Sequence, residues 1–222
     1  MKFPLLYSMF LTFVTCLGQS SQTDLKPYFS ESQIMDLNLI ADFFQSELCG
    51  DKDHAKYGKC MKDLVPKITD LEDNFIEKNI SYRKQKRLYR TISKSTFEKI
   101  WAICKGTRLN EPVYKYESLC FSGNQKFTDF VLELGKTSGY LINYGQTLQS
   151  GLGNGNYIAN NIIDFPLSMN IEDRGVQIIF AIHYLTLNDN LKRDKKLTRL
   201  SKRDLRKLNR TAKKTVPNKT YN

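Results

Sequence analysis

Apolar residues recur at helical spacing along most of the chain. After Ser30, which forms a capping-box pattern with Gln33, apolar positions repeat every three or four residues until Cys49 and Gly50. The apolar positions of this run are Leu37, Ile40, Ala41, Phe44 and Leu48. The pattern predicts an amphipathic helix that buries one face.

Shorter helices are predicted in the region that follows. Residues 55–64 fit a helix that stops before Pro66, since proline has no N–H to donate and clashes with the preceding turn. Residues 68–78 fit another helix. A second capping box, Ser95 with Glu98, begins a third pattern at i, i+3, i+4 and i+7. This pattern predicts a helix that buries the single tryptophan, and its positions are Phe97, Ile100, Trp101 and Cys104.

Two further helices follow in the second half. Asn124 fits the N-cap of a helix over 125–134, with Gly135 at the left-handed closing position. Asn170 precedes a long helix whose one-sided apolar positions include Val176, Ile179, Phe180, His183, Tyr184 and Leu187. No stretch alternates convincingly as a strand. We therefore predict an all-α fold, with a single multi-helix domain over 30–190.

The first residues have the pattern of an export signal. Lys2 supplies a positive charge, and the thirteen residues 3–15 carry none. Thirteen residues are too few to span a bilayer, which takes about 20 helical residues. Three interpretations remain open: cleavage after Gly18 by a general signal peptidase, cleavage and lipidation at Cys16, or an ordinary buried N-terminal helix.

The short apolar run ends at Cys16 and is followed by a tract rich in Gly, Gln, Ser and Thr. In these features the N-terminus resembles that of bacterial lipoprotein precursors. The resemblance implies a lipidated Cys16 and an exported protein, anchored to a membrane on the periplasmic or outer surface; without the lipid the protein would be secreted. We assign 1–18 to the signal segment and 19–29 to a tether.

Four cysteines remain when Cys16 is set aside: Cys49, Cys60, Cys104 and Cys120. An even number in an oxidising compartment favours disulfides. We prefer the pairs that are near in sequence, Cys49 with Cys60 and Cys104 with Cys120, because each pair flanks a predicted turn. The alternative is four free thiols in a cytosolic protein. No metal or cofactor site is predicted, since neither C-x-x-C nor H-x-x-x-H spacing occurs.

Positive charge is concentrated at the C-terminal end. Residues 192–222 contain thirteen basic and two acidic residues, whereas the rest of the chain contains 21 of each sign. We therefore predict a neutral body and a basic tail over 191–222. The sparse leucines of the tail permit either a weakly apolar helix or a solvated extension. The cations predicted to contact an anionic surface are Lys195, Lys196, Arg199, Lys202, Arg203, Arg206 and Lys207.

The expected partners of the tail are acidic envelope components, such as phospholipid headgroups or anionic polysaccharide. Near a membrane each Lys or Arg contributes about 1 kcal/mol. Nucleic acid is not expected, because export separates the tail from it and no aromatic residue interleaves the charges before Tyr221. A second basic cluster at 82–90, with acidic residues upstream, is interpreted as solvated faces that partly offset each other.

Few residues are candidates for catalysis. His183 lies on an apolar helix face and is interpreted as a core residue rather than a base. Glu172 and Asp173 open the same helix, where carboxylates interact favourably with the helix dipole, so they are interpreted as capping residues. His54 lies in a charged turn between two cysteines, where we expect it to be exposed.

Two functions from different classes follow from these features. The leading hypothesis is an exported, membrane-tethered, non-enzymatic helical protein that acts as an interaction or structural module at the cell envelope; its protein partner is not identified. The alternative is a cell-wall glycan hydrolase of the lysozyme-like helical type, which needs a glutamic acid in an apolar cleft. Glu47, Glu98 and Glu172 are its candidates, although each is explained equally well as a surface or cap residue.

Overall fold

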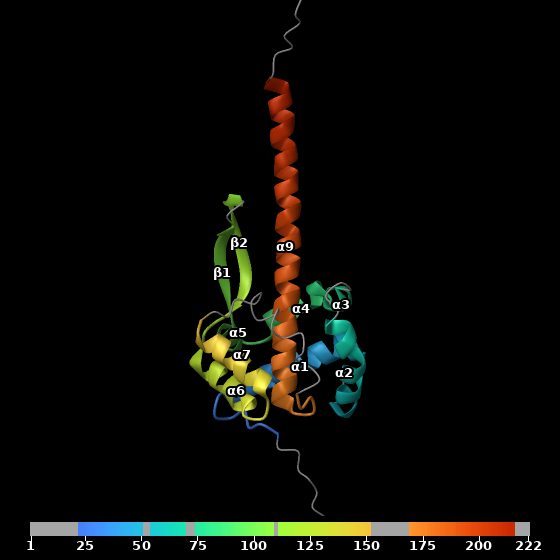
Figure 1. Ribbon diagram of the computed structural model, residues 1–222, viewed down its shortest axis with the longest axis vertical. Helices are drawn as coiled ribbons and strands as arrows, with labels where there is room; N and C mark the ends of the chain where they lie inside the picture. The colour runs from blue at the N-terminus through green and yellow to red at the C-terminus, as the bar shows by residue number, and fades with distance from the viewer. Residues whose placement is uncertain (1–21, 51–53, 70–73, 109–110, 152–168, 216–222) are drawn as a thin grey trace, which may run out of the picture.

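A computed structural model describes residues 22–50, 54–69, 74–108, 111–151 and 169–215. This part of the chain is mostly helical and contains a two-stranded antiparallel hairpin (Figure 1). The elements are α1 (Glu31–Cys49), α2 (His54–Thr69), α3 (Phe75–Asn79), α4 (Tyr82–Thr91), α5 (Lys94–Ile100), β1 (Trp101–Arg108), β2 (Glu111–Phe121), α6 (Gln125–Gly135), α7 (Gly139–Gln149) and α9 (Arg174–Thr215).

The first predicted helix is confirmed at both ends. The Ser30 hydroxyl accepts from the Gln33 amide and the Gln33 side chain accepts from the Ser30 amide, which completes the capping box. Gly50 ends α1 in the left-handed conformation, with φ of 67°. Four of the five predicted apolar positions are fully buried, and the fifth, Leu48, is half-buried against the core.

The prediction that Pro66 stops a helix is wrong. α2 continues through Pro66 to Thr69, so the proline sits inside its last turn. There the missing N–H removes a single hydrogen bond, and the buried Ile68 and Met61 keep the helix against the core. The predicted helix over 68–78 is also wrong, because Ile68 belongs to α2 and α3 begins only at Phe75.

The helix predicted through Trp101 and Cys104 is wrong as well, so the fold is mostly helical as predicted but includes one small hairpin. Its N-cap is Ser93, which accepts from the Thr96 amide, and α5 ends at Ile100. From Trp101 onward the chain pairs antiparallel with β2, and Trp101 lies opposite Phe121. Short apolar runs fit either periodicity, and here the strand-to-strand hydrogen bonds decide the structure.

The helix at Gln125 is confirmed, with the Asn124 side chain accepting from the Phe127 amide at 3.2 Å. Gly135, however, is not in the left-handed conformation. A Cβ on Gly135 would lie 2.7 Å from the Cα of Ile142 in α7. Glycine is therefore needed for the close approach of α6 to α7 rather than for closing the helix.

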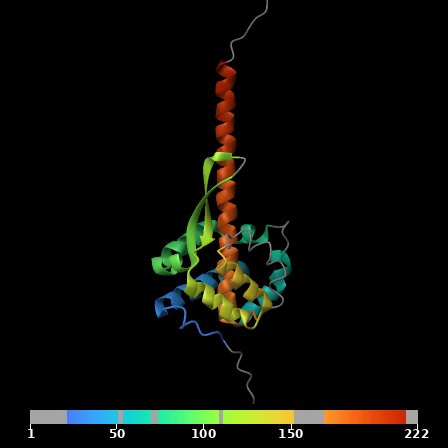
Figure 2. The ribbon, with the colours of Figure 1, turned by 60° about the vertical axis from the view of Figure 1, so that its left-hand side comes forward.

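The central element is α9. Every residue from 175 to 186 is buried, so this half of the helix is surrounded rather than one-sided as predicted. α1, α3, α4, α6 and β2 all contact it, and Phe44 of α1 stacks on Tyr184 (Figures 1 and 2). The helix has 42 residues, which corresponds to a length of about 63 Å.

Buried residues and helix α9 extend outside the segment 30–190 at both ends. Leu25 and Phe29 are buried in the core, and the Phe29 ring meets Phe130 edge-on at 5.3 Å, so the body begins before residue 30. At the other end, α9 crosses the boundary predicted after 190 without a break. The outer part of its second half projects beyond the helical body and the tip of the β1–β2 hairpin (Figure 1).

Candidate functional site: a basic helical arm

The predicted surface-binding cations lie on the projecting half of α9. We call residues 191–215 of this helix the basic arm. All seven of the predicted cations are exposed: Lys195, Lys196, Arg199, Lys202, Arg203, Arg206 and Lys207. The tail is therefore helical as far as Thr215 and continues the central helix without a break.

Helical geometry places the positive charges of the arm on one side. At about 100° per residue, the nine cations from Lys192 to Lys207 fall within roughly half of the helix circumference. The two acidic residues, Asp194 and Asp204, fall on the other half, together with Leu197. The arm therefore presents a continuous cationic face. A high content of basic residues alone does not guarantee such a face; it depends on their spacing along the helix.

Carboxylates of the body neutralise the base of the arm. Glu77 accepts from Lys192 at 2.9 Å and also from Lys195. Burial raises the pKa of Glu77, but the hydrogen bonds from Lys195 and Lys192 outweigh it and hold the pKa below its ordinary value. Beyond Lys195 the sequence of the arm contains a single acidic residue, Asp204, which lies 3.8 Å from Arg203. The net positive charge is thus greatest in the outer part.

Arg193 joins the arm to the hairpin. Its guanidinium contacts the fully buried Asp189 one turn earlier and lies 3.9 Å from Glu117 of β2. Burial lowers the pKa of Arg193, but the hydrogen bond that Arg193 donates to Asp189 raises it by more, so the net shift is upward. The ion pair therefore favours one orientation of α9 against β2.

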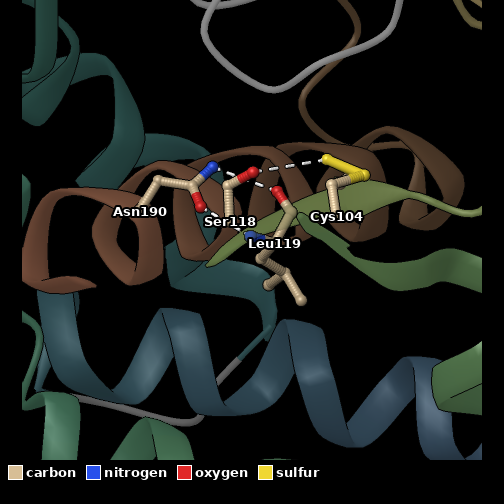
Figure 3. The surroundings of a disulfide bond; sticks show 5 residues. Cys104, Ser118, Leu119 and Asn190 are labelled. Carbon is tan, nitrogen blue, oxygen red and sulfur yellow. Dashed lines mark hydrogen bonds between the residues drawn. A yellow bond between two sulfur atoms is a disulfide. The ribbon is translucent and has the colours of Figure 1, made fainter. Parts of the chain in front are cut away.

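Asn190 fixes the same contact through the backbone. Its side chain accepts from the Leu119 amide at 2.7 Å and donates to the Leu119 carbonyl at 3.0 Å, beside the disulfide of the hairpin (Figure 3). One turn earlier, the Trp101 indole donates to Thr186 at 2.8 Å. These bonds hold both strands against α9 just before the arm begins.

A second buried network joins α9 to α4. Gln85 donates to the Leu185 carbonyl at 2.7 Å and accepts from Asn188 at 2.6 Å. The sequence analysis did not identify these polar residues or Asn190. The sequence nevertheless hints at these contacts, because Thr186, Asn188 and Asn190 interrupt a mostly apolar stretch of the helix. Polar groups buried in such a stretch need hydrogen-bond partners.

The start of α9 is held as firmly as its middle. Asp173 accepts from the amides of Gly175 and Val176, as an N-cap does, and also from the amide and hydroxyl of Thr23. The interpretation of Asp173 as a capping residue is therefore confirmed. Asn170, in contrast, does not cap α9, because it accepts from the Glu172 amide.

Both predicted disulfides are present. Cys49 at the end of α1 is bonded to Cys60 in α2, and Cys104 is bonded to Cys120 across the hairpin. Such bonds are typical of proteins that fold in an oxidising compartment. In the described part of the chain, no helix is long and apolar enough to cross a membrane.

The candidate catalytic groups do not converge. His183 is buried in the core beside Tyr144 and Tyr184, and burial lowers its pKa to about 3. It lies ten residues after Asp173 on α9, or about 15 Å along the axis. His183 is therefore neutral and enclosed, as expected for a core histidine.

The three glutamates considered for glycan hydrolysis lie on separate elements. Glu47 of α1 accepts from the Ser81 amide and from Lys84, so both of its oxygens are engaged. Glu98 is exposed on α5, and Glu172 is exposed beside Gly58. Among the described residues, no group of three or more His, Cys, Asp and Glu side chains is arranged to hold a metal ion.

Cys16 and the signal segment 1–18 lie outside the described residues, as do 19–21 of the tether, and so do the side chain of His54 and the last residues of the tail, 216–222. Comparison with protein-family models found no match, and comparisons with curated proteins and with solved structures found none either.

Proposed function

We propose that this chain is an exported, non-enzymatic protein of the cell envelope, anchored through Cys16, whose basic arm binds a polyanionic surface. The observation that carries the proposal is the one-sided row of exposed cations on a helix that projects beyond the body. A stiff helix keeps these charges in register, so binding does not cost the entropy of ordering a coil.

The distance between the two ends of α9 supports an anionic surface that lies opposite the anchoring membrane. Thr23 is bonded to Asp173 at the beginning of α9. Seven residues separate it from Cys16, a reach of at most about 25 Å. The cations from Lys196 to Lys207 lie about 33 to 50 Å farther along the helix axis from that point. In the proposed arrangement the arm, which begins at the far end of α9 from Thr23, reaches away from the anchoring membrane toward a second anionic layer.

The charge of the arm is sufficient for such an association. Each cation near an anionic membrane contributes about 1 kcal/mol, and the attraction decays over a Debye length of about 8 Å at physiological salt. Seven exposed cations on one helix therefore predict tight binding at low salt and a steep loss of binding as salt rises.

Binding of the arm to a polyanionic surface is tested with the full chain and with two variants that lose the same number of positive charges. In the arm variant, Lys196, Arg199, Lys202 and Arg206 are changed to Gln. In the control variant, four exposed lysines from separate parts of the body are changed to Gln instead: Lys26, Lys94, Lys105 and Lys126. Sedimentation measures binding to phosphatidylglycerol vesicles, to phosphatidylcholine vesicles and to purified anionic cell-wall polymer.

We expect the arm variant to lose at least tenfold in affinity for anionic vesicles or polymer, and the control variant to lose much less. Preference for vesicles over polymer would identify a lipid surface, and the reverse a polysaccharide. Equal losses for the two variants, or binding that salt does not weaken, would show that the arm is not the binding element.

Anchoring through Cys16 is tested separately by cell fractionation. Wild-type chain and a Cys16→Ser variant are compared for membrane association in the presence of high salt, which removes the contribution of the arm. We expect only the wild type to stay with the membrane and to carry the added mass of a lipid. A soluble wild type with unchanged mass would remove the anchor and leave the arm unaffected.

A further inference from the structure

A groove separates α1 from α4, and carboxylates close it at both ends. Glu47, near the end of α1, accepts from the amide of Ser81 at the start of α4. Asp36, near the start of α1, accepts from the amide and hydroxyl of Ser93, just past the end of α4. The two helices therefore run antiparallel, with their ends tied and their middles apart.

The space between them has an apolar floor. Leu39 and Phe43 of α1 and Leu88 of α4 line a groove of about 370 Å³, which is in the size range of ligand sites, roughly 300 to 1,000 Å³. Outside the groove, one turn before Leu39, which is 38% exposed, α1 carries Met35, which is 73% exposed. These side chains form a second apolar stripe beside the one that α1 buries in the core.

The rim of the groove carries unbalanced positive charge. Its own carboxylates are engaged, because Asp42 contacts Arg174 and Glu47 contacts Lys84. On α4, Arg87 lines the groove, and Arg83 and Arg90 lie four residues before it and three after it, so they share its face of the helix beside the groove. In the described part of the chain no carboxylate lies within ion-pair distance of these three arginines.

The sequence suggested that acidic residues upstream of α4 would offset this cluster. Among the described residues, the acid in question, Glu77, pairs elsewhere. Glu77 turns to Lys192 and Lys195 of α9, on another side of α4. The remaining upstream acids, 70–73, lie outside the described residues. An occupant of the groove that brings carboxylates is therefore favoured by charge, and one that brings lysines is disfavoured.

We propose that the groove between α1 and α4 binds an acidic, amphipathic peptide segment of a partner protein. Apolar side chains of the segment pack on Leu39, Phe43 and Leu88, and its carboxylates face Arg87 and its neighbours. The ten residues of α4 span about 15 Å, which accommodates roughly ten residues of a helical segment. The basic arm of this chain is excluded as the occupant by its charge.

The probe is a fluorescent synthetic peptide of about ten residues, with leucines at i, i+4 and i+7 and glutamates at its other positions. A second peptide replaces the leucines by serines and keeps the charge. Both are titrated into the full chain and followed by anisotropy. Because the basic arm attracts the two peptides equally, the difference between them reports binding at an apolar site.

We expect the leucine peptide to bind at least tenfold more tightly than the serine peptide, and Leu39→Glu to abolish this difference. Arg87→Glu should weaken the leucine peptide severalfold. The matched controls are Ile142→Glu on α7, where the side chain is also 38% exposed, and Arg203→Glu on the arm. Neither control should change the difference between the peptides, and unfolding midpoints verify that each variant is folded.

Three outcomes would overturn the proposal. The first is equal binding of the two peptides, which would place both on the arm. The second is a difference between the peptides that survives Leu39→Glu. The third is a concentration-dependent dimer that Leu39→Glu dissociates, because the groove would then be occupied by a second copy of this chain.

Discussion

Single side chains determine where α9 sits. Asn190 is bonded to both backbone groups of Leu119, so a residue on a helix completes the hydrogen bonding of a strand. Gln85 plays the same part toward the Leu185 carbonyl. Buried polar groups of this kind contribute little in net energy but cost much when one partner is removed.

Asn190→Ala should therefore destabilise the body. Both backbone groups of Leu119 lose a buried partner, and we expect the free energy of unfolding to fall by about 1 to 3 kcal/mol. Urea unfolding measures the change. The control is Asn143→Ala on the exposed face of α7, which should stay within about 0.5 kcal/mol of the wild type. Similar values for the two variants would mean that the Leu119 contact does not stabilise the fold.

His183 should make stability depend on pH. Burial lowers its pKa to about 3, while in the unfolded chain histidine titrates near 6.5. Between these values the unfolded state binds the proton and the folded state does not. The free energy of unfolding is therefore unaffected by His183 titration above about pH 6.5. Below that pH it falls by up to about 1.4 kcal/mol per pH unit as the pH drops toward 3.

Urea midpoints measured from pH 7.5 to 4.5 test this dependence in the wild type, in His183→Leu and in His54→Gln. We expect His183→Leu to remove most of the slope between pH 6.5 and 5, and His54→Gln to retain it. A slope that persists in His183→Leu would assign it to other groups.

At the residue level, local contacts could be predicted and distant ones could not. The Ser30 and Asn124 caps were found because each bond spans three residues. The Asn190 bonds to Leu119 cross 71 residues, and no periodicity within the helix reports such a partner. The exposed stripe of α1 had a signal, since Met35, Leu39 and Phe43 repeat at i, i+4 and i+8 beside the buried positions.

At the element level, the hairpin was missed because Trp101 and Cys104 also fit a helical spacing. The β-branched Ile103 and Thr107 favour the strand, but the deciding interactions are with β2 and cannot be read locally. The long helix was found because its apolar pattern is strong. The burial of α9 on all sides could not be predicted, because this burial depends on how many other elements pack against the helix.

The two disulfides should stabilise the elements that they join. Replacing Cys49 and Cys60 together by Ala, or Cys104 and Cys120 together, removes the constraint on a short loop of the unfolded chain. We expect a loss of about 3 kcal/mol in each case, measured by urea unfolding without reductant. Cys16→Ser is the control and should leave the midpoint unchanged. A double variant as stable as the wild type would contradict the stabilising role of its disulfide.

The arm should be helical independently of the body's packing. Thr198 is exposed in the arm, and its replacement by Pro removes a backbone donor at a cost of about 3 kcal/mol to the helix. We expect Thr198→Pro to lower the circular dichroism at 222 nm while leaving the urea midpoint of the body unchanged. Thr198→Ala serves as the control and should keep the signal. An unchanged signal in Thr198→Pro would mean that the arm is not helical in solution.

At the scale of the whole molecule, the arm makes the shape anisotropic. A compact chain of 222 residues has a radius of gyration of about 17 Å. Because α9 alone is about 63 Å long, we expect small-angle scattering to give a clearly larger radius. Truncation after Asn190 should bring the value close to that of a compact body of its own length. A full chain that already scatters as a compact sphere would contradict the projecting arm.

The path of α9 has a mechanical consequence. The chain enters the body beside the first turn of this helix and the arm leaves at the far end. With the N-terminus anchored and the arm bound as proposed, a pull between them would act through α9. Gln85, Trp101 and Leu119, from three different elements, are all bonded to the stretch 185–190, so these bonds would share the load in shear. Such sharing would raise the barrier that governs forced unfolding.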